Sequence, residues 1–371
     1  MTTSFQPPQR ILMGPGPSDV HPRILSALAR PTVGHLDPSF VQLMDEIKEL
    51  LKKTFLTKNE LTFPISAPGS AGMEACLVNL VEPGDQVLVC QNGVFGGRMA
   101  DIVTRIGGQA HLLEQEWGRA IDPNQVEDYL KKHSEISIVC FVHAETSTGA
   151  LSDAKTISQV AHQHNCLVIA DTVTSLAGSE LRVDDWQLDA VYSGSQKCLS
   201  CTPGLSPITL SERAVEKIKQ RKSACVSWFL DLNLVLGYWG SGSKRSYHHT
   251  APVNALYGLH EALVMVQEEG LENSWERHRQ YHQSLIKELQ KIGLKALVPE
   301  GERIPQLNAV VIPKGVDEAA VRLNALNQYG LEIGAGLGPL AGKIWRIGLM
   351  GQSCSQKNVL YCASVLKKLL S

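Results

Sequence analysis

Lys197 is the residue of this sequence whose setting points most clearly to chemistry. It lies in "YSGSQK" (192–197), directly after the apolar run "LDAVYS" (188–193). Burying a lysine without a partner is costly, and a buried lysine can have a lowered pKa and form a Schiff base with an aldehyde. The alternative is an ion pair. Asp171, at the end of "CLVIAD" (166–171), is a carboxylate that could pair with Lys197, cap a helix or act in the reaction.

A turn of small residues adds a third feature. The stretch "SAPGSAG" (66–72) leads into the helix-like "MEACLVNL" (73–80). Free N–H groups and the positive end of the helix dipole favour anions, so a phosphate could bind at Ser70, Ala71 and Gly72. In the alternative interpretation, the turn has no ligand and Ser70 is only the N-cap.

One type of cofactor needs all three features. A phosphorylated pyridine aldehyde requires a lysine to hold it, an acid beside the ring nitrogen and a cradle for the phosphate. Phe95, in "QNGVFGGR" (91–98), could offer an aromatic face to the ring, although a single Phe at this place could equally belong to the core.

Patterns of hydrophobicity predict the elements that position these residues. Apolar runs predict strands at 86–90, 136–143, 166–171 and 188–195, and amphipathic runs predict helices at 71–81, 96–107 and 154–165. Strands that alternate with helices predict an α/β fold with a mainly parallel central sheet flanked by helices. Ligands bind at the carboxyl ends of such strands, and Asp171, Lys197 and "HAET" (143–146) all fall there.

The pattern changes in the last third of the chain. A long helical stretch (253–293) is followed by strand-like "NAVVIP" (308–313), a helix near 317–329, "LEIGAG" (331–336), "KIWRIGLMG" (343–351) and a final helix. These elements predict a smaller C-terminal α+β domain. We therefore expect an irregular N-terminal arm (1–20), a large domain (21–269) and a small domain (270–371).

Composition excludes several classes of function. The chain has 371 residues, with 35 Lys and Arg against 37 Asp and Glu and a net charge of −2, which argues against nucleic-acid and membrane-surface binding. We see no signal peptide and no apolar run long enough to span a bilayer. Nine scattered cysteines fit a reducing compartment. We expect a soluble intracellular protein of the cytoplasm; the C-terminal "KKLLS" leaves a peroxisomal location open.

The candidate residues lie within longer motifs that resemble a known family. Over nearly its whole length the chain is similar to the alanine–glyoxylate (serine–glyoxylate, serine–pyruvate) aminotransferases, class-V enzymes of fold type I that use pyridoxal 5'-phosphate. The matching motifs include "LMGPGPS" (12–18), "STGALSD" (147–153), "LVIADTVTSLAG" (167–178), "YSGSQK" (192–197), "YHHTAPVNALYGLHEAL" (247–263) and "GLGPLAGKIWRIGLMG" (336–351). The resemblance implies ping-pong transamination from alanine or serine to glyoxylate.

This resemblance implies roles at the cofactor. Lys197 would form the Schiff base and carry protons, and Asp171 would keep the pyridine nitrogen protonated. Phe95 would stack on the ring, where animal members often have Trp, and Thr146 would reach toward the ring hydroxyl. The phosphate end would be formed by Gly69, Ser70, Ala71 and Gln196, in a turn where Pro68 removes one N–H donor.

The same resemblance implies how substrate and a second subunit would complete the site. Arg346 would hold the substrate carboxylate, because its guanidinium can bind a carboxylate through two hydrogen bonds. Gly14, in the arm, would line the substrate pocket. Tyr247 and Thr250 would contact the phosphate from the partner subunit of a homodimer.

Alternative functions follow from the cysteines and from relatives of the same fold. Cys198 and Cys201 have the CxxC spacing of redox or zinc sites, but the sequence has no second CxxC, and we expect no bound metal. Cys354 is the nearest candidate for the catalytic cysteine of a desulfurase. A transaminase acting on 3-hydroxykynurenine and a non-catalytic protein that only binds the cofactor are further alternatives.

Overall fold

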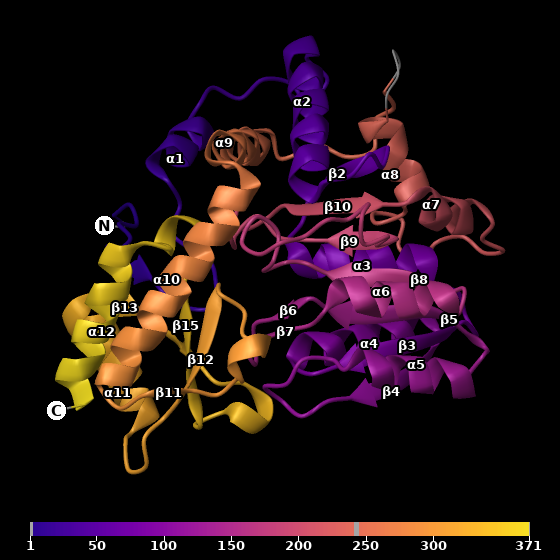
Figure 1. Cartoon of the computed structure of the whole chain (residues 1–371). Helices are drawn as coiled ribbons and strands as arrows, with labels where there is room; N and C mark the ends of the chain where they lie inside the picture. Colours follow the sequence, from indigo (N-terminus) through magenta and orange to yellow (C-terminus); the bar gives the residue numbers. More distant parts are fainter. Residues whose placement is uncertain (1–2, 241–244, 371) are drawn as a thin grey trace.

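A seven-stranded sheet forms the centre of the larger part of the molecule (Figure 1). The computed structural model describes residues 3–240 and 245–370. In order across the sheet, the strands are β2 (Leu61–Ile65), β10 (Ser206–Leu210), β9 (Ala190–Tyr192), β8 (Leu167–Asp171), β5 (Ile136–Val142), β3 (Gln86–Gln91) and β4 (Gln109–Glu114). Of these strands, β10 runs antiparallel to both neighbours and the other adjacent pairs are parallel, which confirms the predicted mainly parallel sheet.

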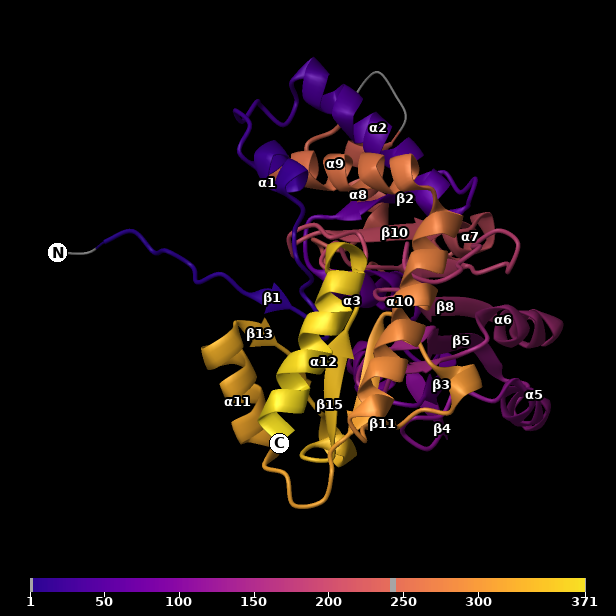
Figure 2. The same ribbon diagram turned by 60° about the vertical axis from the view of Figure 1, so that its left-hand side comes forward.

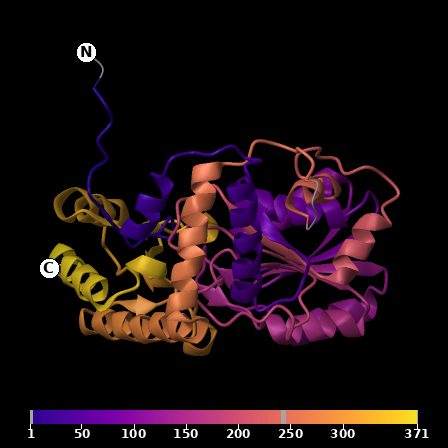
Figure 3. The same ribbon diagram turned by 90° about the horizontal axis from the view of Figure 1, so that it is seen from above.

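Helices cover both faces of this sheet, as the view from above shows (Figure 3). On one side α3 (Gly69–Leu80) packs beside α4 (Val94–Ile106) and α7 (Glu212–Lys219), and α5 (Pro123–Lys132) packs beside α6 (Ala154–Gln163). Covering both faces explains why the central strands are nearly continuous apolar runs. The strand expected at 188–195 is shorter, because the chain leaves the ladder after Tyr192 and enters the loop that carries Lys197.

A second group of helices packs at the β2 edge of the sheet. The helices α1 (Pro22–Leu28) and α2 (Pro38–Phe55) both contact α9 (Val253–Glu269). The helix α8 (Leu232–Trp239) precedes α9 in the sequence. Among the described residues, we find no helix with both the length and the apolar character needed to cross a membrane.

A four-stranded sheet organises the C-terminal part, coloured orange to yellow in Figure 1. Its strand order is β11 (Lys295–Ala296), β12 (Leu307–Val311), β15 (Ile344–Gly348) and β14 (Gly334–Ala335), and its helices are α10 (Leu271–Lys291), α11 (Glu318–Tyr329) and α12 (Gln356–Leu370). Apolar residues of this sheet and these helices form a buried cluster of their own. The remaining short elements are β1 (Ile11–Leu12), β6 (Ala144–Glu145), β7 (Ala150–Leu151), β13 (Leu331–Glu332), and the 3-10 helices at 300–302, 338–340 and 351–353.

Gly270 divides the helical stretch that the sequence pattern presents as continuous. With φ of 83° it lies in the left-handed region, which glycine adopts at little cost, and so it ends α9 and precedes α10. The predicted domain boundary between residues 269 and 270 coincides with this break. The division into an arm and two domains is otherwise still a prediction.

The N-terminal arm connects the two sheets. Residues 3–10 extend away from the body (Figure 2), and β1 then pairs in parallel with β13. The Gly348 N–H donates to the Met13 carbonyl at 2.7 Å. Farther along, the Ser18 hydroxyl donates to the Lys197 carbonyl at 2.7 Å. The arm thus joins the small sheet to the lysine loop before α1 begins.

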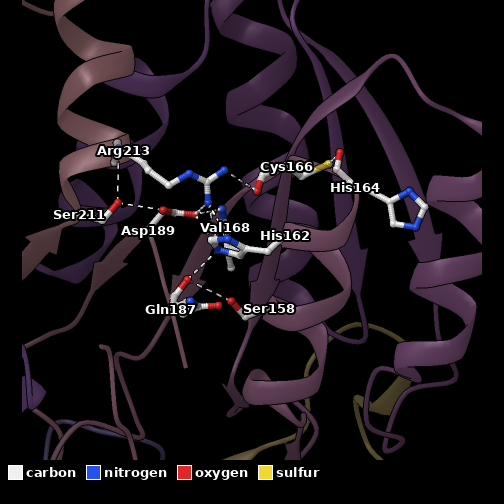
Figure 4. Close-up of polar contacts among 10 residues, drawn as sticks. Ser158, His162, His164, Cys166, Val168, Gln187, Asp189, Ser211 and Arg213 are labelled. Atoms are coloured by element: carbon white, nitrogen blue, oxygen red, sulfur yellow. Dashed lines mark hydrogen bonds and ion pairs between the residues drawn. The ribbon is translucent and has the colours of Figure 1, made fainter. Parts of the chain in front are cut away.

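Asp189 organises the opposite end of the large sheet, at the amino end of β9 (Figure 4). Its carboxylate is buried and accepts hydrogen bonds from the Val168 N–H at 3.0 Å and the Ser211 hydroxyl at 2.8 Å. Arg213 lies 3.3 Å and His162 lies 3.2 Å from the same carboxylate. These contacts join β8, β9 and the start of α7 to α6.

We predict that Asp189→Ala destabilises the protein by about 3 kcal/mol, because it leaves buried donors without an acceptor. The control is Asp101→Ala, which removes an exposed pair with Arg105 and should cost about 0.5 kcal/mol or less. Urea denaturation midpoints, measured at equal cofactor concentration, test the difference. Equal midpoints for the two variants would contradict this interpretation of Asp189.

Candidate active site

A cavity of about 160 Å³ lies at the carboxyl ends of β5 and β8, beside the first turns of α3 and α4. Ligands bind at this end of a parallel sheet. The sequence-predicted residues that line the cavity are Gly69, Ser70, Phe95, Thr146, Asp171, Gln196 and Lys197. A wider groove of about 770 Å³ along α10 contains none of them.

Lys197 enters this cavity from the loop after β9 and is almost fully buried. Burial, followed by the positive charge of Arg346, lowers its pKa to about 8. Its ammonium donates to the Pro15 carbonyl of the arm. Gly16 has φ of 105°, and a Cβ there would lie 2.5 Å from the lysine Nζ. A side chain at Gly16 would therefore clash with the lysine.

Asp171 occupies the last position of β8 and lines the same cavity. Its two carboxylate oxygens accept hydrogen bonds from the Val173 N–H and the Tyr192 hydroxyl, each at 2.8 Å. Burial raises the pKa of Asp171 to about 7, and these two hydrogen bonds oppose the rise. No helix follows directly within residues 172–189, so Asp171 caps a turn and not a helix.

The first turn of α3 forms another part of the cavity wall, through Gly69 and Ser70. Its N-cap is Pro68, which provides no side-chain cap, so Ser70 is not the N-cap that one sequence interpretation suggested. The Ser70 hydroxyl instead accepts a hydrogen bond from Arg98 Nη1 at 2.9 Å. Ala71 lies in the same turn but does not line the cavity. An uncapped helix start and a guanidinium together favour an anion.

Phe95 is positioned by a buried carboxylate. The Glu145 side chain accepts hydrogen bonds from the Phe95 N–H at 3.2 Å and from the Ser147 hydroxyl at 2.6 Å. A Cβ on Gly93, which precedes α4, would lie 2.4 Å from the carboxyl carbon of Glu145. Glu145 therefore holds the first turn of α4 against the β6–β7 hairpin. The guanidinium of Arg98 lies 5.1 Å from the centre of the Phe95 ring.

Arg346 lies in the middle of β15, outside the set of residues that line the cavity. It donates from Nε to the Ala335 carbonyl at 2.6 Å and from Nη1 to the Thr146 carbonyl at 3.2 Å. Burial lowers its pKa to about 10, and the Glu145 carboxylate opposes this change. The guanidinium thus joins the small sheet to the hairpin at the edge of the cavity.

The remaining predicted residues lie farther from the lysine. Gly14 is buried and does not line the cavity; a Cβ on it would lie 3.7 Å from the Glu332 carboxylate and 3.8 Å from the Gly334 nitrogen. Tyr247 and Thr250 are exposed; the side chain of Tyr247 is 63% accessible. Within the described part of the chain, neither residue lines the cavity of its own subunit.

Pro15, Arg98 and Tyr192 are site residues that sequence reasoning missed. Tyr192 had a usable signal, because a tyrosine in a buried strand usually needs a hydrogen-bond partner and Asp171 is its cross-strand neighbour. The contacts of Pro15 and Arg98 depend on how the arm and α4 pack, which no local pattern indicates.

The cysteine alternatives receive no support from the geometry. Cys198, Cys201 and Cys354 are free and buried. Burial raises the pKa of Cys198 to about 12, of Cys201 to about 11 and of Cys354 to about 12, so the reactive thiolate forms are disfavoured. Cys354 does not line the lysine cavity.

The chemistry of the cavity fits pyridoxal phosphate. It combines a lysine of lowered pKa, a buried carboxylate, an aromatic ring and an uncapped helix start beside a guanidinium. The Gln196 Oε1 atom is buried, with no hydrogen-bond partner among the described residues, and so can accept a hydrogen bond from a ligand group that carries a donor.

Comparison with known proteins gives concordant results. Residues 22–345 match the family model "Aminotransferase class-V". The structure of an alanine–glyoxylate aminotransferase from Nostoc sp. is 43% identical and superimposes with a TM-score of 0.98, covering 100% of this chain and 98% of that one. The (S)-ureidoglycine–glyoxylate transaminase of Bacillus subtilis is 39% identical, over 98% of this chain and 91% of its own length. The alanine–glyoxylate aminotransferase of Oryctolagus cuniculus is 38% identical, over 98% and 93%.

The family model spans most of the chain and includes the seven strands of the large sheet and the lysine loop, and the similar structure from Nostoc sp. covers the rest, including β15. The protein is thus a member of the class-V aminotransferase family, with the fold type I architecture and the pyridoxal-phosphate dependence of that family.

Proposed function

We propose that this enzyme transfers the amino group of a small amino acid, alanine or serine, to glyoxylate. The observation that carries the proposal is the meeting of Lys197 and Asp171 in one buried cavity. Similar proteins support the choice of acceptor, because glyoxylate occurs in the names of both the alanine-type and the ureidoglycine-type relatives. The reaction would be ping-pong, with one cavity serving amino acid and keto acid in turn.

When bound, pyridoxal phosphate supplies an electrophilic aldehyde carbon and a ring that withdraws electrons from the substrate Cα. Lys197 would bond covalently to the aldehyde carbon and, once displaced by substrate, would move the proton of the substrate Cα. A pKa of about 8 leaves part of the lysine population neutral near pH 7, as both tasks require. Asp171 would hold a proton at the ring nitrogen through its carboxylate.

Other residues would orient the ring and its substituents. Phe95 would stack on one face, and Thr146 would lie toward the ring hydroxyl. The phosphate would bind at the start of α3, through Gly69, Ser70 and Ala71, and beside Gln196. The absence of a side-chain cap at Pro68 supports this assignment for the N–H groups of Gly69 and Ser70, which need acceptors, whereas the Ala71 N–H already donates to the Pro68 carbonyl at 2.7 Å.

Arg346 would bind the carboxylate that amino acid and keto acid have in common. A guanidinium has five N–H donors, and the two hydrogen bonds to the carbonyls of Ala335 and Thr146 fix its plane without using all of them. Gly14 would allow the arm to pass close to the substrate.

The exposure of Tyr247 and Thr250 supports a homodimer with shared sites. Both would contact the phosphate of the partner subunit, since neither reaches the cavity of its own subunit. The nine free cysteines support a reducing compartment, and we propose the cytoplasm.

A second donor has a specific observation in its favour. The Bacillus subtilis relative named for (S)-ureidoglycine is about as similar to this chain as the alanine-type relatives. The 3-hydroxykynurenine and desulfurase alternatives have no such support, and the buried Lys197 and Asp171 argue against a non-catalytic protein.

We expect alanine or serine with glyoxylate to give the highest kcat/KM. The assay is a panel of alanine, serine, (S)-ureidoglycine and 3-hydroxykynurenine, each tested with glyoxylate and pyruvate. Lys197→Ala should lower turnover by at least about a thousandfold, and borohydride reduction of the wild-type enzyme should label Lys197. A tenfold higher kcat/KM with (S)-ureidoglycine than with alanine or serine would show that the proposed donor is wrong. Failure to use glyoxylate with any donor would refute the proposed acceptor.

Asp171→Asn should slow turnover by several powers of ten, or about 4 kcal/mol or more of barrier.

Asp171→Asn should also change how the stability of the apoenzyme depends on pH. The folded pKa of Asp171 is raised to about 7 from 3.8, so the stability that its protonated form provides is complete below pH 4 and is lost as pH rises through 7. The asparagine variant should therefore be more stable than wild type at pH 8, and denaturation at pH 4 and 8 measures this. Near-normal turnover of Asp171→Asn would mean that Asp171 only caps the turn and has no part in the reaction.

Shared sites predict complementation between two inactive variants. One is Lys197→Ala, and the other is Tyr247→Phe combined with Thr250→Ala, assayed at limiting cofactor. In a mixed dimer, one site receives both defects and the other receives neither, so co-refolding should restore activity. Differently tagged chains verify the mixing. If mixed dimers form and activity stays absent, each site belongs to a single subunit.

A further inference from the structure

Three potential metal ligands meet at the edge of the large sheet, at the end opposite the lysine cavity. His111 lies on the edge strand β4, His133 is the C-cap of α5, and Glu135 directly precedes β5. One ligand atom from each residue lies within 4.8 Å of the other two. None of these residues has a role in the proposed transamination.

The hydrogen bonds around His111 fix which of its two ring nitrogens carries the proton. The Gln86 amide donates from Nε2 to the Gly84 carbonyl at 3.2 Å, which identifies Oε1 as the atom that faces His111. This oxygen lies 2.7 Å from His111 Nε2, so Nε2 carries the proton and donates. Nδ1 therefore keeps its lone pair, which accepts a long hydrogen bond of 3.4 Å from the Tyr129 hydroxyl and which an ion could take in its place. Histidine ligands of metals commonly donate their other N–H to a carbonyl in this way.

His133 and Glu135 face each other. The Nδ1 atom of His133 lies 3.0 Å from Glu135 Oε1, close to the separation of two ligands of one ion, so an ion in place of the proton between them would bind both atoms. The Tyr129 ring stacks on the His133 ring at 4.6 Å between centres and meets the His111 ring edge-on. The two imidazole centres are 5.3 Å apart. The side chains of His133 and Glu135 are 37% and 50% exposed, which gives an ion access from solvent.

We propose that His111, His133 and Glu135 bind one divalent transition-metal ion of the Zn²⁺ type. Nitrogen and oxygen ligands in this number, with water in the fourth position, form a tetrahedral zinc site. Bonds of about 2.1 Å place the ligand atoms about 3.4 Å apart, and rotation of the exposed Glu135 and His133 side chains can close the present separation. The ion would join the edge strand β4 to the connection between α5 and β5. It would thereby stabilise an edge that is otherwise open to pairing with another strand.

The test measures metal binding to the holoenzyme after treatment with a chelator. Equilibrium dialysis against Zn²⁺ gives affinity and stoichiometry, and the visible absorption of Co²⁺ reports the ligand set. The variants are His111→Ala and Glu135→Gln. The matched control is His164→Ala, because His164 is the C-cap of the adjacent helix α6, as His133 is of α5, and its side chain points away from the polar cluster around Asp189 (Figure 4).

We expect one saturable site per chain in wild type and in His164→Ala, and at least tenfold weaker binding in His111→Ala and Glu135→Gln. Zn²⁺ should raise the Tm of wild type but not of these two variants, and their transaminase activity should be unchanged. Wild-type affinity in His111→Ala, equal weakening in His164→Ala, or no saturable binding in wild type would each overturn the proposal.

Discussion

Desolvation of Lys197 and Asp171 at one end of the central sheet is the constraint on which the rest of the structure depends. Removing water moves the two pKa values toward each other, to about 8 and about 7, so that both groups titrate close to physiological pH. Such a pair is unstable unless hydrogen bonds hold it. Tyr192, Val173 and the Pro15 carbonyl provide them.

These supports come from widely separated parts of the chain. The Tyr192 hydroxyl belongs to the strand beside Asp171, and the Pro15 carbonyl belongs to the arm. Glu145 performs the corresponding task for Phe95, since its buried carboxylate holds the first turn of α4. Hydrogen bonds from distant parts of the chain therefore position these side chains without a bound ligand, as a preorganised catalytic site requires.

The sequence reveals the ends of strands better than the contacts between them. Asp171 and Lys197 could be placed in one site because both follow apolar runs in a βαβ pattern, and this rule is independent of side-chain detail. The helical pattern of residues 253–293 presents α9 and α10 as one helix, because Gly270, with φ of 83°, separates them without interrupting the periodicity. The roles of Pro15 and Arg98 depend on packing between distant segments. Arg346 could be located through its motif, but its hydrogen bonds to Thr146 and Ala335 could not.

The pairing of β1 with β13 also has a consequence for the order of folding. Ile11 is synthesised long before its partner Leu331. The large sheet contains residues from 61 to 210, so it can form on the ribosome while the arm still lacks its partner. The arm can contact the lysine loop once that loop has emerged, but β1 can pair with β13 only after Leu331 has emerged. A nascent chain therefore passes through a stage in which the large sheet can be complete while the β1 end of the arm has no partner strand.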